Sequence, residues 1–84
     1  MSPVVELIEG IAAGQEPAFH ALVLQEGPAL LRFVRTLTPS QEAAEDALQE
    51  ALVDILRGAR GYRGGDARSW MFRVARNAAY RSHR

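Results

Sequence analysis

Apolar residues recur at helical spacing in four stretches of this 84-residue chain, and this spacing constrains its fold more than any other feature. The stretches run from Ser2 to about Gly14, then over about 17–37, 41–59 and 67–82. No segment alternates apolar and polar residues as a half-buried strand does. We therefore predict an all-α fold, a small bundle of about four helices with a glycine-rich loop before the last helix.

Residues typical of helix ends separate these stretches. Ser2, Ser40 and Asp66 each stand where a side chain would cap the first turn of the following helix. The pair Gly27-Pro28 interrupts the second stretch, because proline cannot donate a backbone hydrogen bond. We expect either a kink there or two helices that meet at Gly27. The sequence GARGYRGGD at 58–66 predicts a loop.

Length and composition exclude several classes of protein. A chain of this size forms one domain with a modest core, so we expect marginal stability. The absence of cysteine excludes disulfides and thiolate metal sites. His20 and His83 are far apart in sequence, and we predict no metal site and no cofactor. No apolar run approaches the roughly 20 residues of a membrane span and no signal peptide is visible, so we expect a soluble, cytoplasmic protein without membrane insertion.

The formal net charge of zero conceals an uneven distribution. Residues 1–56 carry nine acidic residues and two arginines, a net charge of −7. Residues 57–84 carry eight arginines and one acidic residue, a net charge of +7, and the chain has no lysine. This asymmetry predicts a basic partner for the first part of the chain and an acidic partner for the second.

The third predicted helix presents carboxylates on the side opposite its apolar residues. Its polar side holds Glu42, Glu45, Asp46, Gln49 and Glu50, with Val53 among them. No lysine or arginine precedes Arg57 in this helix, so the carboxylates lack the cationic neighbours of an ordinary solvated face. A solvated surface is the alternative. We interpret the side as a docking patch for a basic partner.

The segment from Arg57 to Arg84 interleaves arginine with aromatic residues. Guanidinium groups match phosphate, and an aromatic ring can stack on an unpaired base. The alternative is that most of these arginines pair with the acidic helices of the same chain. We favour binding of single-stranded nucleic acid. No nucleophile or enclosed acid-base pair can be argued, so we predict no enzymatic activity.

Two strings resemble a known family. They are AEDALQEAL at 44–52 and SWMFRVARN at 69–77, and in this order and spacing they resemble region 2 of bacterial RNA polymerase sigma factors of the extracytoplasmic-function (ECF) group. The likeness extends from about residue 18 to 84. The strings depart from the family pattern at Ala51-Leu52, where a larger pair such as Phe-Leu is common, at Met71, where leucine is usual, and in the absence of lysine.

The resemblance implies a role for each half of the chain. The third helix would dock on the clamp coiled coil of the largest subunit of the polymerase core. The last helix and the loop would hold the non-template strand of the promoter −10 element, with an extruded base in the loop. The residues implied for polymerase are Asp46, Gln49 and Glu50, and the docking patch adds Glu42 and Val53 to this polymerase-binding set. The residues implied for DNA are Arg60, Tyr62, Arg63, Gly64 and Asp66 in the loop, and Arg73, Arg76, Asn77, Tyr80 and Arg81 in the helix.

Two further expectations concern the whole chain. The sequence ends at Arg84 before any segment like the family's −35-reading domain, so we expect residues 1–84 to be an isolated region 2 domain that does not direct initiation alone. The main alternative function is a protein-interaction module that binds an anti-sigma factor. A duplex-binding helix-turn-helix is disfavoured, because the turn before the last helix has about eight residues instead of three or four.

Overall fold

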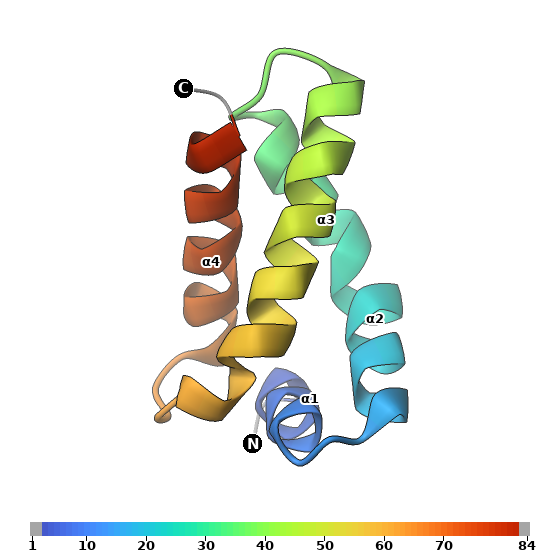
Figure 1. Cartoon of the computed structure of the whole chain (residues 1–84), viewed down its shortest axis with the longest axis vertical. Helices are drawn as coiled ribbons and strands as arrows, with labels where there is room; N and C mark the ends of the chain where they lie inside the picture. The colour runs from blue at the N-terminus through green and yellow to red at the C-terminus, as the bar shows by residue number, and fades with distance from the viewer. Residues whose placement is uncertain (1–2, 83–84) are drawn as a thin grey trace.

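The computed structural model describes residues 3–82, and this part of the chain is helical and contains no strand. The elements are α1 (Pro3–Ala12), α2 (Glu16–Arg35), α3 (Gln41–Gly58), the short 3₁₀-helix η1 (Ala59–Gly61) and α4 (Ala67–Ser82). Helices α2, α3 and α4 run side by side along the long axis of the molecule, and α1 lies across one end of them (Figure 1). The predicted all-α bundle is confirmed.

Two of the predicted caps begin the helices that carry the charged surfaces. The side-chain oxygen of Ser40 accepts a hydrogen bond of 3.1 Å from the backbone amide of Ala43 at the start of α3. A carboxylate oxygen of Asp66 accepts one of 3.1 Å from the amide of Ser69 at the start of α4. Each cap satisfies an amide that has no partner within its helix. The third predicted cap, Ser2, lies outside the described residues.

Helix α2 is one continuous helix with Pro28 inside it, so the alternative of two helices meeting at Gly27 is wrong. Proline at this position leaves the carbonyl of Leu24 without its usual partner four residues on. Leu24 is 78% exposed and Pro28 is also exposed, so this side of the helix faces water, which can satisfy the freed carbonyl. The helix therefore tolerates the proline.

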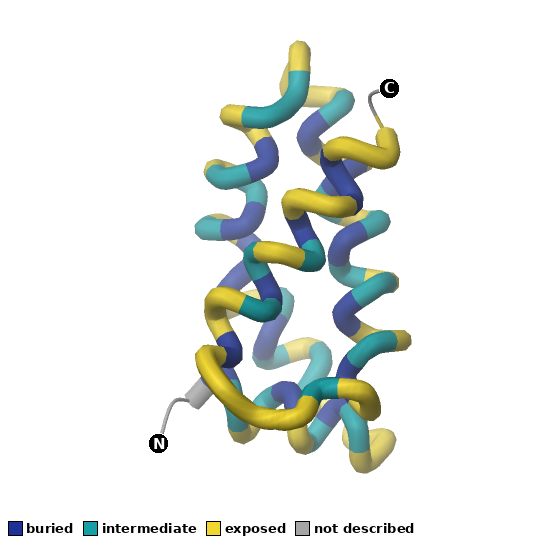
Figure 2. The backbone as a smooth tube through the Cα atoms, turned by 90° about the vertical axis from the view of Figure 1, so that its left-hand side faces the viewer, coloured by how far each residue is buried: buried dark blue, intermediate teal, exposed yellow. Residues whose placement is uncertain are grey.

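The core lies between the helices, where the buried positions of the tube face inward (Figure 2). Its largest fully buried side chains include Ile8, Leu22, Leu30 and Met71. Helices α3 and α4 pack on each other, and both bury small side chains, which are Ala44, Ala47 and Ala51 on one helix and Ala75, Ala78 and Ala79 on the other. Alanine at these positions lets the two helices approach closely. The same two helices carry the opposite charges.

Helix α4 also contacts α2 through one ion pair and one pair of rings. Glu26 is the one buried charged residue of the described part, and its Oε1 lies 3.1 Å from Nη1 of Arg68. No donor within the described residues points at this oxygen with hydrogen-bond geometry, so the contact is an ion pair. The rings of Phe33 and Phe72 lie 5.1 Å apart at 53°. None of the described helices is long and apolar enough to cross a membrane.

Candidate functional site

The exposed residues of α3 form a continuous acidic stripe. Glu42, Asp46, Gln49 and Val53 follow one another at intervals of four, three and four residues, which places them on one side of the helix. All four are exposed, and Glu50 beside them is half-buried. We call these five residues the acidic face. An open depression of about 600 Å³ runs along it, and its lining residues are Asp46, Gln49, Glu50, Val53, Asp54, Arg57 and Arg81.

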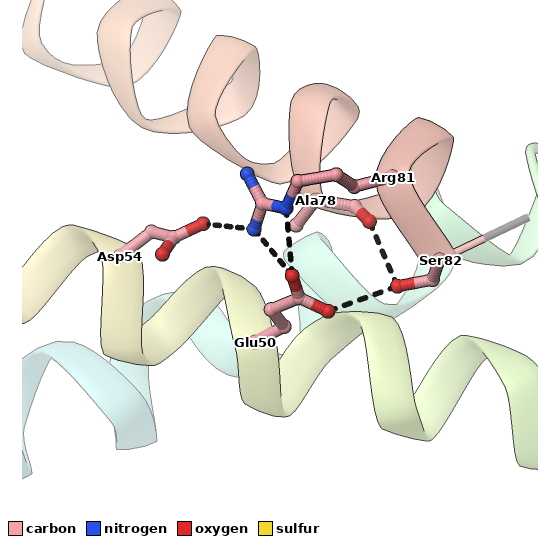
Figure 3. A network of polar contacts seen from close by, with 5 residues as sticks. All are labelled: Glu50, Asp54, Ala78, Arg81 and Ser82. Atoms are coloured by element: carbon pink, nitrogen blue, oxygen red, sulfur yellow. Dashed lines mark hydrogen bonds and ion pairs between the residues drawn. The ribbon is translucent and has the colours of Figure 1, made fainter.

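Arg81 of α4 reaches into this depression and pairs with two carboxylates of α3 (Figure 3). Its Nε donates to Oε1 of Glu50 at 2.8 Å. Its Nη2 contacts that same Glu50 oxygen and also donates to Oδ2 of Asp54, the latter at 2.6 Å. The hydroxyl of Ser82 lies 3.0 Å from the other Glu50 oxygen and 2.9 Å from the carbonyl of Ala78. We call Glu50, Asp54 and Arg81 the bridging cluster.

The contacts of the bridging cluster favour the charged forms of Glu50 and Arg81. Hydrogen bonds from Arg81 and then from Ser82 lower the pKa of Glu50 below its ordinary value of 4.5. Hydrogen bonds to Asp54 and Glu50 raise the pKa of Arg81 above its ordinary value. Because hydrogen bonds to an ionised form stabilise that form, Glu50 and Arg81 both stay charged at neutral pH.

The bridging cluster joins two residues that the resemblance assigns to different partners. Glu50 is implied for polymerase and Arg81 for DNA, yet their side chains contact each other across the α3–α4 interface. The two helices run in opposite directions (Figure 1), so the last turn of α4 lies beside the middle of α3. The two predicted surfaces therefore meet at this point.

The remaining predicted residues of α4 form an exposed stripe. Arg73, Arg76, Asn77 and Tyr80 are all exposed, and their intervals of three, one and three residues place them on one broad side of the helix. We call these four residues the basic face. Neither arginine makes an ion pair with any residue of the described part, so both guanidinium groups are available to a ligand.

A shallow depression of about 330 Å³ adjoins the basic face. Arg73 and Arg76 line it together with Ser69 and two aromatic residues, Phe33 and Phe72. The sequence analysis did not assign Phe33, Ser69 or Phe72 to this surface. The alternation of Phe72 with arginines was the available signal for that residue. Phe33 had none, because its apolar spacing in α2 indicates a core position.

The loop between α3 and α4 is held by its own contacts. Gly58 still belongs to α3 and Ala59–Gly61 form η1, so 62–66 remain as the connection. The Tyr62 hydroxyl donates to the carbonyl of Gly65 at 2.7 Å, and its ring lies 5.5 Å from that of Trp70. Gly64 and Gly65 have φ of +97° and +88°, which side chains rarely adopt. The loop conformation therefore depends on these glycines.

Three predicted DNA-contacting residues of the loop already use polar atoms within the chain. Besides Tyr62, a guanidinium nitrogen of Arg63 donates to the carbonyl of Arg60 at 2.8 Å. The carboxylate of Asp66 caps α4, and the hydrogen bond from the Ser69 amide lowers the pKa of Asp66 below its ordinary value of 3.8. The side chain of Arg60 and the backbone of Gly64 are exposed. These contacts pre-organise the loop and leave part of it open to a ligand.

Internal ion pairs account for a minority of the arginines in the basic segment. Arg68 pairs with Glu26, and Arg81 pairs with Glu50 and Asp54. The others in the described range make no ion pair there, and they are Arg57, Arg60, Arg63, Arg73 and Arg76. The alternative in which most of these arginines pair internally is therefore wrong for residues 57–82. Residues 3–82 include no group of three or more potential metal ligands that could hold a metal ion.

Comparison with known proteins identifies the family. Residues 22–84 match the family of sigma-70 region 2. The ECF RNA polymerase sigma factor SigM of Mycobacterium tuberculosis is 36% identical over 74 residues, which cover 87% of this chain and 38% of SigM. The RNA polymerase sigma-H factor of Pseudomonas aeruginosa is 31% identical over 75 residues, 88% of this chain and 39% of that protein. The ECF sigma factor BldN of Streptomyces coelicolor is 32% identical over 76 residues, 88% of this chain and 29% of BldN.

The chain belongs to the sigma-70 region 2 family, and it is a region 2 domain of the ECF type. It spans about two fifths or less of the length of the curated relatives it matches. No solved structure gives a significant match. Both strings that carry the resemblance lie within the matched residues, on α3 and α4.

Proposed function

We propose that this chain is the part of an ECF sigma factor that recognises the promoter −10 element and binds the polymerase core. In this proposal the basic face and the loop bind the non-template strand, and the acidic face binds the clamp coiled coil of the largest subunit. The domain positions its partners and catalyses no reaction. Since RNA polymerase works in the bacterial cytoplasm, we also place this chain there.

The observation that carries the proposal is the exposed, unpaired pair of arginines on the basic face. Arg73 and Arg76 stand one turn apart on α4 and make no ion pair within the described residues, and Asn77 follows Arg76 directly. Arginine binds phosphate through several donors at once, and asparagine can read a base edge through a donor and an acceptor. Tyr80, 54% exposed, adds a ring on which a base can stack.

The acidic face supports the second half of the proposal. Its residues surround an open depression and include an exposed apolar side chain, Val53, at 43% exposure. Charges around a small apolar contact favour rapid encounter with a basic surface and set its register. A basic pair of helices in the polymerase would therefore meet complementary charge along α3.

The test is selection of single-stranded oligonucleotides from a randomised pool by the 84-residue chain. We expect enrichment of a short motif that binds more tightly than its scrambled version and than the same sequence in duplex form. The logarithm of the binding constant should fall with the logarithm of salt concentration, by about 0.7 for each phosphate contacted. Equal affinity for selected and scrambled strands would contradict sequence recognition by this chain.

A second candidate function is binding of an anti-sigma factor, favoured by apolar side chains that the fold leaves exposed. Leu24 is 78% and Leu56 47% exposed. Leu56 also lines a depression of about 350 Å³ with Ile11, Phe19 and His20. A pull-down with an anti-sigma domain would support this function if capture persists after Arg73, Arg76 and Arg81 are changed to glutamine. Loss of capture in that triple variant would indicate that the basic residues carry the interaction.

A further inference from the structure

The acidic depression is already occupied by a cation from the same chain. Arg81 contacts both Glu50 and Asp54, and all three residues line the depression. Both oxygens of Glu50 have partners, Arg81 on one and Ser82 on the other. A basic side chain of a partner that approaches Glu50 therefore meets a carboxylate that is already engaged.

The same contacts withhold Arg81 from a nucleic acid. Its Nε and Nη2 donate to carboxylates of α3, whereas Arg73 and Arg76 make no ion pair in the described part of the chain. Phosphate would have to compete with two carboxylates for this guanidinium. Through these donors Arg81 can bind either the carboxylates of α3 or a phosphate of the nucleic acid, but not both at once.

We propose that the bridging cluster couples the two binding surfaces. A basic side chain of the polymerase that enters the depression displaces Arg81 from Glu50 and Asp54, and the released guanidinium then binds phosphate of the DNA strand. This inference rests on the proposed function and adds a regulatory link to it. By thermodynamic linkage the effect is reciprocal, so DNA that captures Arg81 frees the carboxylates for polymerase.

The structure makes such an exchange feasible without rearrangement of the core. The side chains of Arg81 and Glu50 are 45% and 41% exposed, so a competing ion can reach the pair from solvent. Exposed ion pairs contribute little to stability and exchange readily. The neighbouring Ala78 and Ala79 are fully buried and need not move, so rotation of the Arg81 side chain alone is sufficient.

The experiment measures two affinities for single-residue variants of the full 84-residue chain. The probes are bacterial RNA polymerase core enzyme and the fluorescently labelled strand obtained by selection. Glu50→Gln should bind the strand about two- to fivefold more tightly, because Arg81 then keeps Asp54 as its one carboxylate partner in the cluster, and should bind core more weakly. Arg81→Gln should show the opposite pattern, with core binding about two- to fivefold tighter and strand binding weaker.

Matched controls separate this coupling from a general change of charge. Glu9→Gln and Arg35→Gln remove the same charges at exposed positions of α1 and α2 that lie outside both surfaces. Their effects should be smaller than those of the cluster variants. In the double variant Glu50→Gln/Arg81→Gln, the gain in strand affinity from Glu50→Gln should disappear, because no guanidinium is left to release.

Several outcomes would overturn the coupling. They are a weakening of both affinities by each variant, a gain from Glu50→Gln no larger than that from Glu9→Gln, or a gain that persists when Arg81 is absent. Circular dichroism of each variant verifies folding. If Arg81→Gln did not fold, Arg81→Lys would replace it, since lysine keeps the charge but loses the forked contact, and it should show the same signs with smaller size. A wild-type chain that binds neither probe would instead reject the proposed function itself.

Discussion

The acidic face of α3 and the basic face of α4 are built alike but differ in how much of their charge is free. The two helices pack on each other, and each buries a row of alanines and turns its charged residues outward. Part of the acidic charge is held by Arg81, whereas Arg73 and Arg76 on the basic face are paired with nothing in the described range. The comparison shows that most of the opposite charges on α3 and α4 stay unpaired with each other, while those of the bridging cluster pair.

The largest expected effect comes from truncating a side chain of the hydrophobic core that supports both faces. Met71 is fully buried, so Met71→Ala leaves a cavity and should destabilise the fold by about 2–5 kcal/mol. For so small a core this is most of the stability, and both binding activities should be lost together. Urea unfolding followed by circular dichroism measures the change. Val53→Ala, at an exposed position, should stay within about 0.5 kcal/mol of wild type.

A second variant pair should affect the basic face alone. Arg76→Ala removes a charge-assisted hydrogen bond and should weaken binding of all single strands about tenfold. The dependence on salt should also become shallower by about 0.7. Asn77→Ala should instead reduce the preference for the selected strand over a scrambled one. Fluorescence anisotropy titrations at several salt concentrations measure both. Core binding without DNA should be unchanged in both variants, because neither residue belongs to the bridging cluster.

The converse variant should affect the acidic face alone. Asp46 is exposed and belongs to no ion pair of the described part, so Asp46→Asn removes a free charge without altering the bridging cluster. We expect core binding to weaken about two- to fivefold, mainly through slower association and less so at high salt. Stopped-flow or surface-binding kinetics would show this. An unchanged association rate would indicate that polymerase does not approach along α3.

The smallest expected effect is a loss of stability in acid. The pKa values of Glu50 and Asp66 are lowered below 4.5 and 3.8, so their ionised forms stabilise the fold fully above these values. That stability is lost as the pH falls through the lowered folded-state pKa values. The melting temperature should therefore fall as the pH drops below about 4.5, and less steeply in Asp66→Asn. Since asparagine can still cap the helix, an equally steep fall in that variant would mean that ionised Asp66 does not contribute to the acid dependence.

Local sequence patterns predicted most of the fold, because helices depend on neighbouring residues. The helices lie at nearly the positions that the sequence indicates, through the 3.6-residue period, the caps at Ser40 and Asp66, and the stop at Gly14. Local sequence does not decide whether α2 continues through Pro28, because proline in a helix is tolerated only where its surroundings compensate for the missing hydrogen bond.

The sequence by itself determined the helices, the family and the division of charge into an acidic and a basic part. Only the tertiary structure decided which charges remain free. Glu50 and Arg81 are 31 residues apart, and Glu26 and Arg68 are further apart still. Whether such residues meet depends on the register in which helices pack, and periodicity within one helix carries no information about that register. The bridging cluster, and with it the proposed link between the two surfaces, follows from the packing of α4 on α3.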